Sequence, residues 1–321
     1  MDIFIFFSQF LLVPALAPLA TGIIRKCKAH MQNRVGASVF QPYRDLWKLF
    51  HKDEVISEDA SWIFRFTPYL IFAVMVFVGA SVPVITTLAP TLFIESSFPI
   101  SFLPSGDFIM IIYLLALTTF FLALAGMDVG SGFGGFGSSR EMTMAALAEG
   151  GLFFSLLVAS VIAQTGNVQM MVESLQGVPY QSSIPLLIAF IAFFIALLAE
   201  NSRFPVDNPS THLELTMIHE AMILEYSGKR LALIEWASWS KLVIFIALGA
   251  NIFFPWGVAT SLLPTLVAPS IVFFVFKALC LLVAIAFIES TMAKFRIFRV
   301  PDLLFTSFVL SVIALAVTIT F

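Results

Sequence analysis

Long apolar stretches alternate with short polar segments along the whole chain. A helix that crosses about 30 Å of hydrocarbon needs about 20 apolar residues. Eight stretches meet this requirement, at Ile3–Ile24, Thr67–Leu88, Phe108–Met127, Met142–Ala163, Ile184–Glu200, Ala232–Phe254, Leu266–Glu289 and Leu303–Phe321. The pattern predicts an all-α polytopic membrane protein with eight transmembrane helices, in which residues 1–321 form one integral membrane domain. We interpret the apolar start of the chain as a retained first helix and not as a cleaved leader.

The basic residues are concentrated in every second connection between these spans. All but two of the 17 lysines and arginines lie there, and the exceptions, Lys241 and Lys277, fall inside spans. Cytoplasmic connections carry an excess of lysine and arginine. The distribution therefore predicts cytoplasmic loops at residues 25–66, 128–141, 201–231 and 290–302, with both termini on the outer side. One span more or fewer would destroy this pattern, which supports the count of eight.

The first cytoplasmic connection contains an amphipathic segment with the sequence PYRDLWKLF, from Pro42 to Phe50. Its apolar residues can share one helical side, and they are Leu46, Trp47, Leu49 and Phe50. A proline at its start and this pattern predict a short helix that lies in the membrane interface. Two interpretations stay open: a simple anchor, or a doorway or docking surface.

The third cytoplasmic connection contains a formal GxGxxG at Gly130, Gly132 and Gly135. A dinucleotide-binding fingerprint needs a preceding strand and a βαβ unit, and the sequence predicts neither here. We expect a flexible loop up to Arg140.

The composition agrees with a membrane protein. Hydrophobic residues make up 60% of the chain and charged residues 12%, whereas soluble domains contain about 25% charged residues. The net charge of −3 gives no reason to expect a nucleic-acid partner. Two isolated cysteines, Cys27 and Cys280, are too few for an iron–sulfur cluster or a zinc site, and the pair His212 and His219 is only a weak metal signal. We therefore expect no cofactor or metal in this chain, and any redox centre should belong to a partner.

Three charged residues lie well inside predicted spans, away from their ends: Glu149, Lys241 and Lys277. Each costs about 2.5–3.5 kcal/mol at a helix centre, so together they oppose insertion by about 9 kcal/mol. Such residues should face the bundle interior, one another or water. Two interpretations stay open: a structural ion pair, for example between Glu149 and a lysine, or membership of a proton path.

Further carboxylates extend this set near the cytoplasmic span ends, at Glu141, Glu200, Glu235 and Glu289, with Asp128 close by. Glu200 and Glu289 are also compatible with hydrated helix ends. The segment from Ala199 to Lys229 adds Arg203 and the acids Asp207, Glu214, Glu220 and Glu225. Carboxylates next to a low dielectric have raised pKa values and exchange protons near neutral pH. Glu141 and Glu149, eight residues apart, are expected to share a helix side.

Several strings resemble one family along nearly the whole chain. They are AHMQNRVGASVFQPYRDLWKLF and FRFTPYL, AGMDVGSGFGGFGSSREMTMAALAE, AENSRFPVDNP with HLEL and LEYSG, and FKALCLL with ESTMAKFR. The chain resembles subunit 1 of respiratory complex I and its relatives in membrane-bound nickel–iron hydrogenases. It is closer to the hydrogenase branch of the formate hydrogenlyase type.

The resemblance implies a non-catalytic subunit that docks a peripheral electron-transfer arm and couples its redox reaction to proton or sodium movement. It implies a prokaryotic inner membrane, hydrogenase-like large and small peripheral subunits, antiporter-like membrane subunits, and nickel–iron and iron–sulfur centres in those partners. The residues that match the family pattern are Arg140, Glu149, Glu200, Arg203, Pro205, Asp207, Glu214 and Glu225. Ser210 and His212 stand where complex I often has acids, which affects the expected proton route.

Two other functions stay open at this stage. A complex I subunit would contribute a quinone site near Arg34, the segment around Trp47, and Arg203. A stand-alone ion transporter is disfavoured, because the sequence has no internal repeat.

Overall fold

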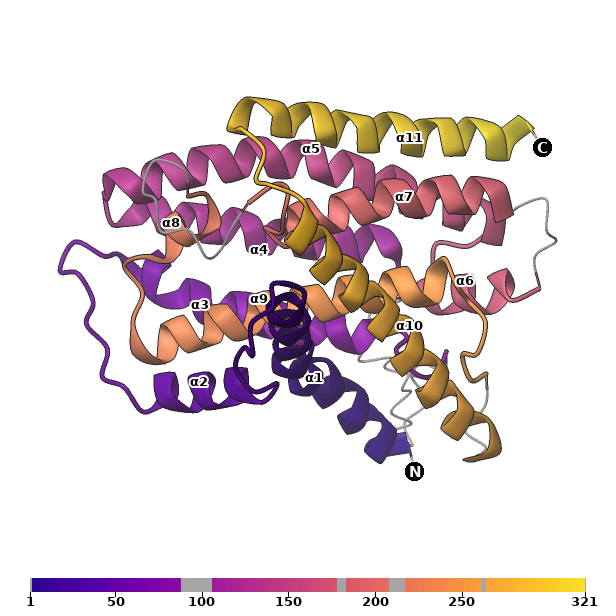
Figure 1. Cartoon of the computed structure of the whole chain (residues 1–321), viewed down its shortest axis with the longest axis horizontal. Helices are drawn as coiled ribbons and strands as arrows, with labels where there is room; N and C mark the ends of the chain where they lie inside the picture. The colour runs from indigo at the N-terminus through magenta and orange to yellow at the C-terminus, as the bar shows by residue number, and fades with distance from the viewer. Residues whose placement is uncertain (1, 88–105, 178–182, 208–216, 261–263, 321) are drawn as a thin grey trace, which may run out of the picture.

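The computed structural model describes residues 2–87, 106–177, 183–207, 217–260 and 264–320. Within these ranges the fold is helical, and extended pairing is limited to two isolated bridges (Figure 1). The helices are α1 (Asp2–Met31), α2 (Gln41–Phe50), α3 (Trp62–Ser81), α4 (Phe108–Asp128), α5 (Gly132–Ala163), α6 (Val168–Leu175), α7 (Ser183–Glu200), α8 (His219–Ile223), α9 (Gly228–Ile252), α10 (Pro264–Thr291), the 3-10 turn η2 (Ile297–Arg299) and α11 (Val300–Thr320). The all-α prediction is confirmed.

Six of these helices are long and apolar enough to cross a membrane: α3, α4, α5, α9, α10 and α11, the last taken together with η2. The shorter apolar stretch Ile184–Glu200 in α7 coincides with the fifth predicted span. Helix α1 covers the first predicted span. A multi-pass membrane protein is thus supported, while the count of eight spans stays a prediction.

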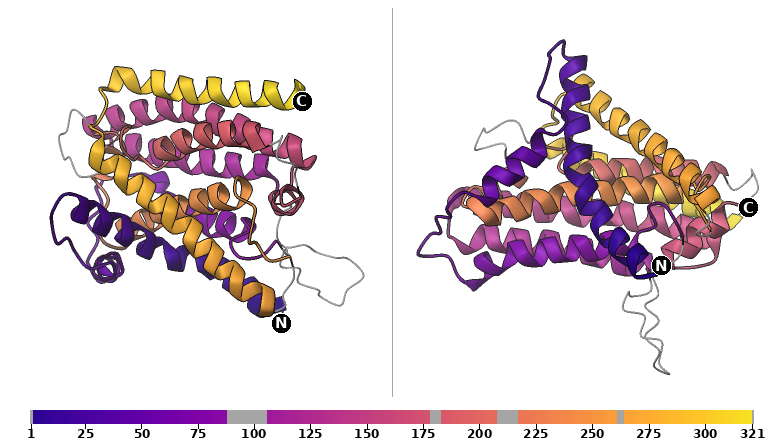
Figure 2. Two further views of the ribbon diagram at one scale, coloured as in Figure 1. Left: turned by 45° about the vertical axis from the view of Figure 1, so that its right-hand side comes forward. Right: turned by 90° about the horizontal axis from the view of Figure 1, so that it is seen from below.

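The bundle has a nearly parallel part and two oblique helices. Helix α5 packs against α4, α7 and α11, and α9 packs against α1 and α3. Helices α1 and α10 cross the bundle obliquely and approach each other at their C-terminal ends (Figure 2). This meeting point lies beside the turn that follows α7, and it carries many of the charged residues described below.

The Gly-rich segment is helical, so the expectation of a flexible loop over residues 128–141 was wrong. Helix α5 already begins at Gly132. A Cβ on Gly134 would lie 2.1 Å from the Gly126 carbonyl oxygen, and one on Gly137 would lie 2.9 Å from that of Ile218. The glycines therefore allow α5 to approach α4 and the start of α8 closely. Tertiary packing outweighs the low helix propensity of glycine here.

Two prolines in α1 create a polar attachment point. Pro18 has no N–H group, so the carbonyl four residues before it, at Pro14, receives no helical hydrogen bond. The indole Nε1 of Trp236 on α9 donates to this oxygen at 2.7 Å. The defect in one helix thereby becomes a specific contact with another.

Helix α2 confirms the short helix predicted from Pro42, but its apolar residues do not all lie on one buried side. Leu46 is buried, whereas Trp47 is 70% exposed. Phe50 contacts the ring of Trp236 on α9. The location of α2 in a membrane interface remains a prediction, with Trp47 available to a bilayer or a partner.

Helix α3 begins at Trp62, earlier than the span predicted from Thr67. Ser61 caps the helix by accepting a hydrogen bond from the Ile63 N–H at 3.1 Å. The Asp128 carboxylate at the end of α4 accepts from the Ser61 N–H at 2.9 Å. Local capping, which hydropathy does not register, sets this boundary.

Candidate functional site

A buried ion pair lies at the centre of the candidate site. Lys241 Nζ on α9 is 2.8 Å from Glu200 Oε2, at the last residue of α7. The side chains are 11% and 4% exposed, respectively. Lys241 also donates to Thr119 Oγ1 on α4 at 3.3 Å. The pair therefore joins three helices, and it corrects the interpretation that paired a span lysine with Glu149.

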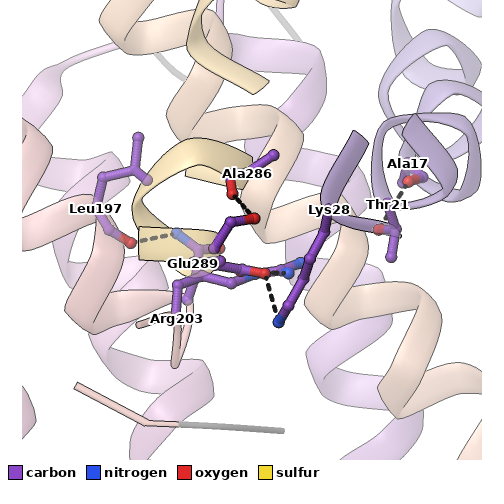
Figure 3. A network of polar contacts seen from close by, with 9 residues as sticks. Ala17, Thr21, Lys28, Leu197, Arg203, Ala286 and Glu289 are labelled. Carbon is purple, nitrogen blue, oxygen red and sulfur yellow. Dashed lines mark hydrogen bonds and ion pairs between the residues drawn. The ribbon is translucent and has the colours of Figure 1, made fainter. Parts of the chain in front are cut away.

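Glu289 forms a second charged centre where α1 and α10 meet. Its carboxylate is 3.2 Å from Lys28 Nζ and 3.0 Å from Arg203 Nη1 (Figure 3). The Lys28 ammonium also lies over the ring of Phe204. Glu289 is almost completely buried and bridges two cations, so it acts as an ion-pairing group at the end of α10.

Asp207 connects three segments of the same region. Its Oδ1 is 2.6 Å from Lys294 Nζ, and its Oδ2 accepts from the His219 N–H at 3.3 Å. The carboxylate is buried. The turn after α7 is thus attached to α8 and to the segment that precedes η2.

A polar cavity of about 430 Å³ opens beside these groups. Its charged lining residues are Arg25, Lys28, Arg34, Arg203, Glu220, Glu235 and Glu289. A smaller cavity of about 40 Å³ lies against the Glu200–Lys241 pair, and Glu141 also lines it. Four residues line both cavities: Asn201, Ser202, His219 and Ser238. The large cavity and the buried pair are therefore separated by one layer of small polar side chains and a histidine.

Burial changes the protonation of two groups in this layer and at its edge. Burial raises the pKa of Glu220 to about 7, and the negative charges of Glu235 and Asp207 add to the effect. Burial lowers the pKa of His219 to about 4, although Asp207 opposes this change. At neutral pH, His219 is uncharged, whereas Glu220 is near its titration midpoint and can take up or release a proton.

The structure brings together only part of the predicted proton-path set. Glu200, Glu141 and Lys241 line the small cavity, and Glu220, Glu235 and Glu289 line the large one. Asp207 and Glu141 share a third, very small cavity with Glu200. Glu225 is exposed after α8. Glu214, like His212, lies outside the described residues.

Glu149 and Lys277 are not among the lining residues of the cavities around this group. Eight residues correspond to about 80° of rotation beyond two turns, and on α5 the smallest cavity is lined by Glu141, Ala145 and Ala148 but not by Glu149. Lys277 Nζ donates to Asn251 Oδ1 at 2.9 Å, to the Phe254 carbonyl at 2.9 Å and to the Trp256 carbonyl at 3.2 Å. Among the described residues, no carboxylate lies within ion-pair distance of Lys277.

The predicted docking residues are also dispersed. Arg34 and Arg203 line the large cavity. Arg140 donates to the Met217 carbonyl at 3.3 Å, which joins α5 to the segment before α8. Asp128 caps α3, and Trp47 is exposed on α2.

Sequence reasoning missed several residues of the site. Lys28 and Lys294 count in the sequence only as positive charges, yet each neutralises a buried carboxylate. Asn201 and Ser238 do not stand out, because an amide and a hydroxyl give no sequence signal until their neighbours are known. His219 gave only a weak metal signal together with His212.

Metal chemistry has no support within the described part of the chain. No group of three or more His, Cys, Asp or Glu side chains is placed there to hold a metal ion. The expectation that redox centres belong to partner subunits stays a prediction.

The chain is similar to known membrane subunits over almost its full length. The NADH dehydrogenase family model matches residues 3–320. Hydrogenase-4 component C of Escherichia coli is 33% identical, covering 96% of this chain and 93% of the relative. Formate hydrogenlyase subunit 4 of Escherichia coli is 32% identical, covering 94% of this chain and 93% of the relative. A subunit of the NADH-quinone oxidoreductase of Wolbachia pipientis is 28% identical, covering 89% of this chain and 86% of the relative.

A solved structure has the same fold. A chain of the membrane-bound sulfane sulfur reductase, an archaeal respiratory membrane complex, superposes with a TM-score of 0.80 and covers 99% of both chains at 21% identity. The fold, the match to residues 3–320 and the relatives above 30% identity together establish that this chain belongs to the NADH dehydrogenase family of membrane subunits.

Proposed function

We propose that this chain is the membrane-anchoring and coupling subunit of a multisubunit oxidoreductase of the membrane-bound hydrogenase type. Its similarity to hydrogenase-4 component C and formate hydrogenlyase subunit 4 supports this assignment. In the proposal the chain spans a prokaryotic inner membrane eight times, with both termini outside. Peripheral large and small subunits, which carry the nickel–iron and iron–sulfur centres, dock on the cytoplasmic end, and antiporter-like subunits lie beside it in the membrane.

The observation that carries the coupling role is the pair of adjoining cavities. The large cavity, at the meeting point of α1 and α10, is lined by Glu220 and Glu235, and the small one reaches the Glu200–Lys241 pair. Buried ionisable groups with altered pKa values are common where protons are transferred. A redox change in the docked partner would alter the electrostatic potential at the large cavity. The proton affinity of Glu220 would respond first, because its pKa of about 7 is close to ambient pH.

The change would then reach the bundle through the small cavity. Glu141 lines this cavity together with Glu200 and Lys241, and Glu149 lies two helical turns further along α5. In this proposal either protons or a change in electrostatic potential pass from the large cavity to Glu141 and Glu200. From there they continue toward Glu149 and the neighbouring membrane subunits. The identity of the translocated ion, proton or sodium, is a separate question for the same assay.

Coupling can be tested with charge-neutral variants in the intact complex. Glu141→Gln and Glu149→Gln should leave assembly and partial redox activity of the peripheral arm unchanged and should lower ion movement per electron at least fivefold in proteoliposomes. Glu58→Gln, which changes an exposed carboxylate in the first connection, is the matched control. Wild-type ion movement in both buried variants would exclude the relay.

A second candidate is a quinone-binding subunit of an NADH:quinone oxidoreductase. The cavity of about 430 Å³ favours it, because ligand pockets commonly have volumes of about 300–1,000 Å³. Bound quinone in the purified complex, or competitive inhibition by quinone-site ligands that Arg34→Gln relieves, would support this function. Nickel in the purified complex and no bound quinone would select the hydrogenase type.

A further inference from the structure

An apolar groove of about 330 Å³ lies between α7 and α10, and it shares no lining residue with the polar cavities described above. Helices α7 and α10 both contact α9. Because α10 crosses the bundle obliquely, it diverges from α7 and leaves a wedge between the two helices (Figure 1). Ala250 on α9 lies at the floor of this groove, where its small side chain leaves space.

The groove is long and follows α10. The residues of α10 that line it are Phe276, Lys277, Cys280, Leu281 and Ala284. Their spacing places them on one side of the helix, along about 12 Å of its length. Phe190 and Phe194 on α7 line the opposite wall, and Phe254 and Trp256, which follow α9, line one end. An extended, flexible ligand fits such a groove, whereas a compact ligand would leave part of it empty.

The lining of the groove offers little to a polar ligand. Of the described residues that line it, only Lys277 is charged. Its ammonium group donates to Asn251 and to the Phe254 and Trp256 carbonyls, so its three hydrogens are already used. The thiol of Cys280 is only a weak donor. A lipid headgroup, a quinone ring or a bound ion would therefore find no strong partner in the groove, and apolar cavities do not hold water.

The groove opens toward the membrane. Phe276 at its edge and the neighbouring Val283 on α10 are both exposed. Side chains around an unfilled space lose dispersion contacts, and the molecules that surround a membrane helix are lipids. Trp256 follows the end of α9, and tryptophan is enriched at membrane–water interfaces. Ala284 lies well inside the apolar span of α10. The groove thus begins at the interface and continues into the hydrocarbon layer, as one chain of a phospholipid does.

We propose that the groove between α7 and α10 is a binding site for one acyl chain of a phospholipid, whose headgroup lies at the membrane surface beside Trp256. The aromatic rings of α7 and of the segment after α9 hold the chain by dispersion contacts along its length. Because Lys277 has no free hydrogen, the site selects the chain and not the charge of the headgroup. The lipid fills the wedge that the oblique path of α10 creates and so completes the packing of three helices. The site does not depend on the proposed coupling function.

The lipid site is tested on the intact complex in nanodiscs of phosphatidylethanolamine that include the same lipid with a diazirine in one acyl chain. A cryo-EM map that resolves annular lipids should contain elongated density from Trp256 to Ala284. Irradiation should attach the labelled lipid to Phe194 on one wall of the groove and to Cys280 on the other, as mapped by mass spectrometry of peptides. Phosphatidylglycerol, with the same label, should give the same density and the same adducts.

A variant that fills the groove separates a bound lipid from bulk lipid. Ala284→Phe places a ring in the groove and should remove the density and lower the Phe194 adduct several-fold. Val283→Phe is the matched control and should change neither, because Val283 is exposed on the same helix and does not line the groove. If Ala284→Phe does not assemble, Cys280→Phe, at an exposed position of the same helix side, supplies the test through the Phe194 adduct.

Four results would overturn the proposal. The first is an empty groove in a map that resolves annular lipids, and the second is a groove filled by side chains of a partner subunit. The third is density that appears only when quinone is present, which would assign the groove to an isoprenoid chain. The fourth is an unchanged Phe194 adduct in the variant that fills the groove, which would show labelling by bulk lipid only.

Discussion

Replacing Lys241 by methionine tests the central ion pair, because methionine keeps the volume and removes the charge. At 2.8 Å the attraction between Lys241 and Glu200 is about 6 kcal/mol for an effective dielectric constant of about 20. Most of this attraction offsets the loss of hydration of the two groups. The single variant, however, leaves a carboxylate that is only 4% exposed without its counter-charge. We expect Lys241→Met to destabilise the fold by about 3–5 kcal/mol.

The double variant Glu200→Gln/Lys241→Met distinguishes a lost pair from a lost side chain. Because both charges are gone, it should be within about 1–2 kcal/mol of the wild type, so the costs of the two single variants should not add. Unfolding of the chain in lipid nanodiscs, measured by steric trapping, gives the four free energies of the cycle.

An exposed ion pair serves as the control in the same assay. Arg25 and Asp45 are 3.8 Å apart, with side chains 51% and 42% exposed. Arg25→Gln should therefore change the free energy of unfolding by less than about 1 kcal/mol. Additive effects in the central cycle, with Lys241→Met no more costly than this control, would refute the view that Glu200 and Lys241 are desolvated partners.

Three other predictions follow from single contacts. Gly137→Val should destabilise the fold by about 1–3 kcal/mol through overpacking, because a Cβ at this position lies 2.8–2.9 Å from its nearest atoms. Gly135→Ala is the control and should be neutral or slightly stabilising, since a Cβ there has nothing within 4 Å. Thermal unfolding of the complex compares the two variants. Burial raises the pKa of Glu220 from 4.5 to about 7, so this group lowers the stability of the fold as pH rises from 4.5 to 7. Glu220→Gln should therefore flatten the dependence of the unfolding free energy on pH between these values. An unchanged slope would contradict the raised pKa. Asn251→Ala should destabilise the fold by about 1–3 kcal/mol, because it removes one hydrogen bond each from Lys277 and from the Pro83 and Val84 carbonyl groups. A melting temperature equal to that of the wild type would show that these hydrogen bonds contribute nothing to stability.

Hydropathy predicted the helices but not their exact limits. The apolar runs around α4, α9, α10 and α11 dominate their local sequence, so their positions follow from composition alone. The Gly-rich start of α5 was misjudged, because its helicity depends on the approach of Gly126 and Ile218, which are not neighbours in sequence. Packing between distant segments thus decided what local propensity could not.

In the candidate site, too, the local sequence identified charged residues but not their partners. The sequence identified Lys241 as a charge inside a span that needs a partner, and Glu200 as a candidate proton-path acid near a span end that was also compatible with a hydrated helix end. The sequence could not pair Glu200 with Lys241, because the pairing depends on the packing of the C-terminal end of α7 against α9. Lys277 was grouped with the others for its charge, yet its acceptors are an amide and two backbone carbonyls, which no residue pattern encodes.

The three bonds of Lys277 have a consequence for how the end of α9 is closed. An ammonium group has three hydrogens, and here each one is directed to a different oxygen at or just beyond the last turn of α9. The side chain acts as a tethered equivalent of a potassium ion, delivered by α10 to the negative end of another helix. A dissolved ion would leave in dilute salt, but a tethered one remains, so this corner should keep its shape whatever electrolyte bathes the membrane.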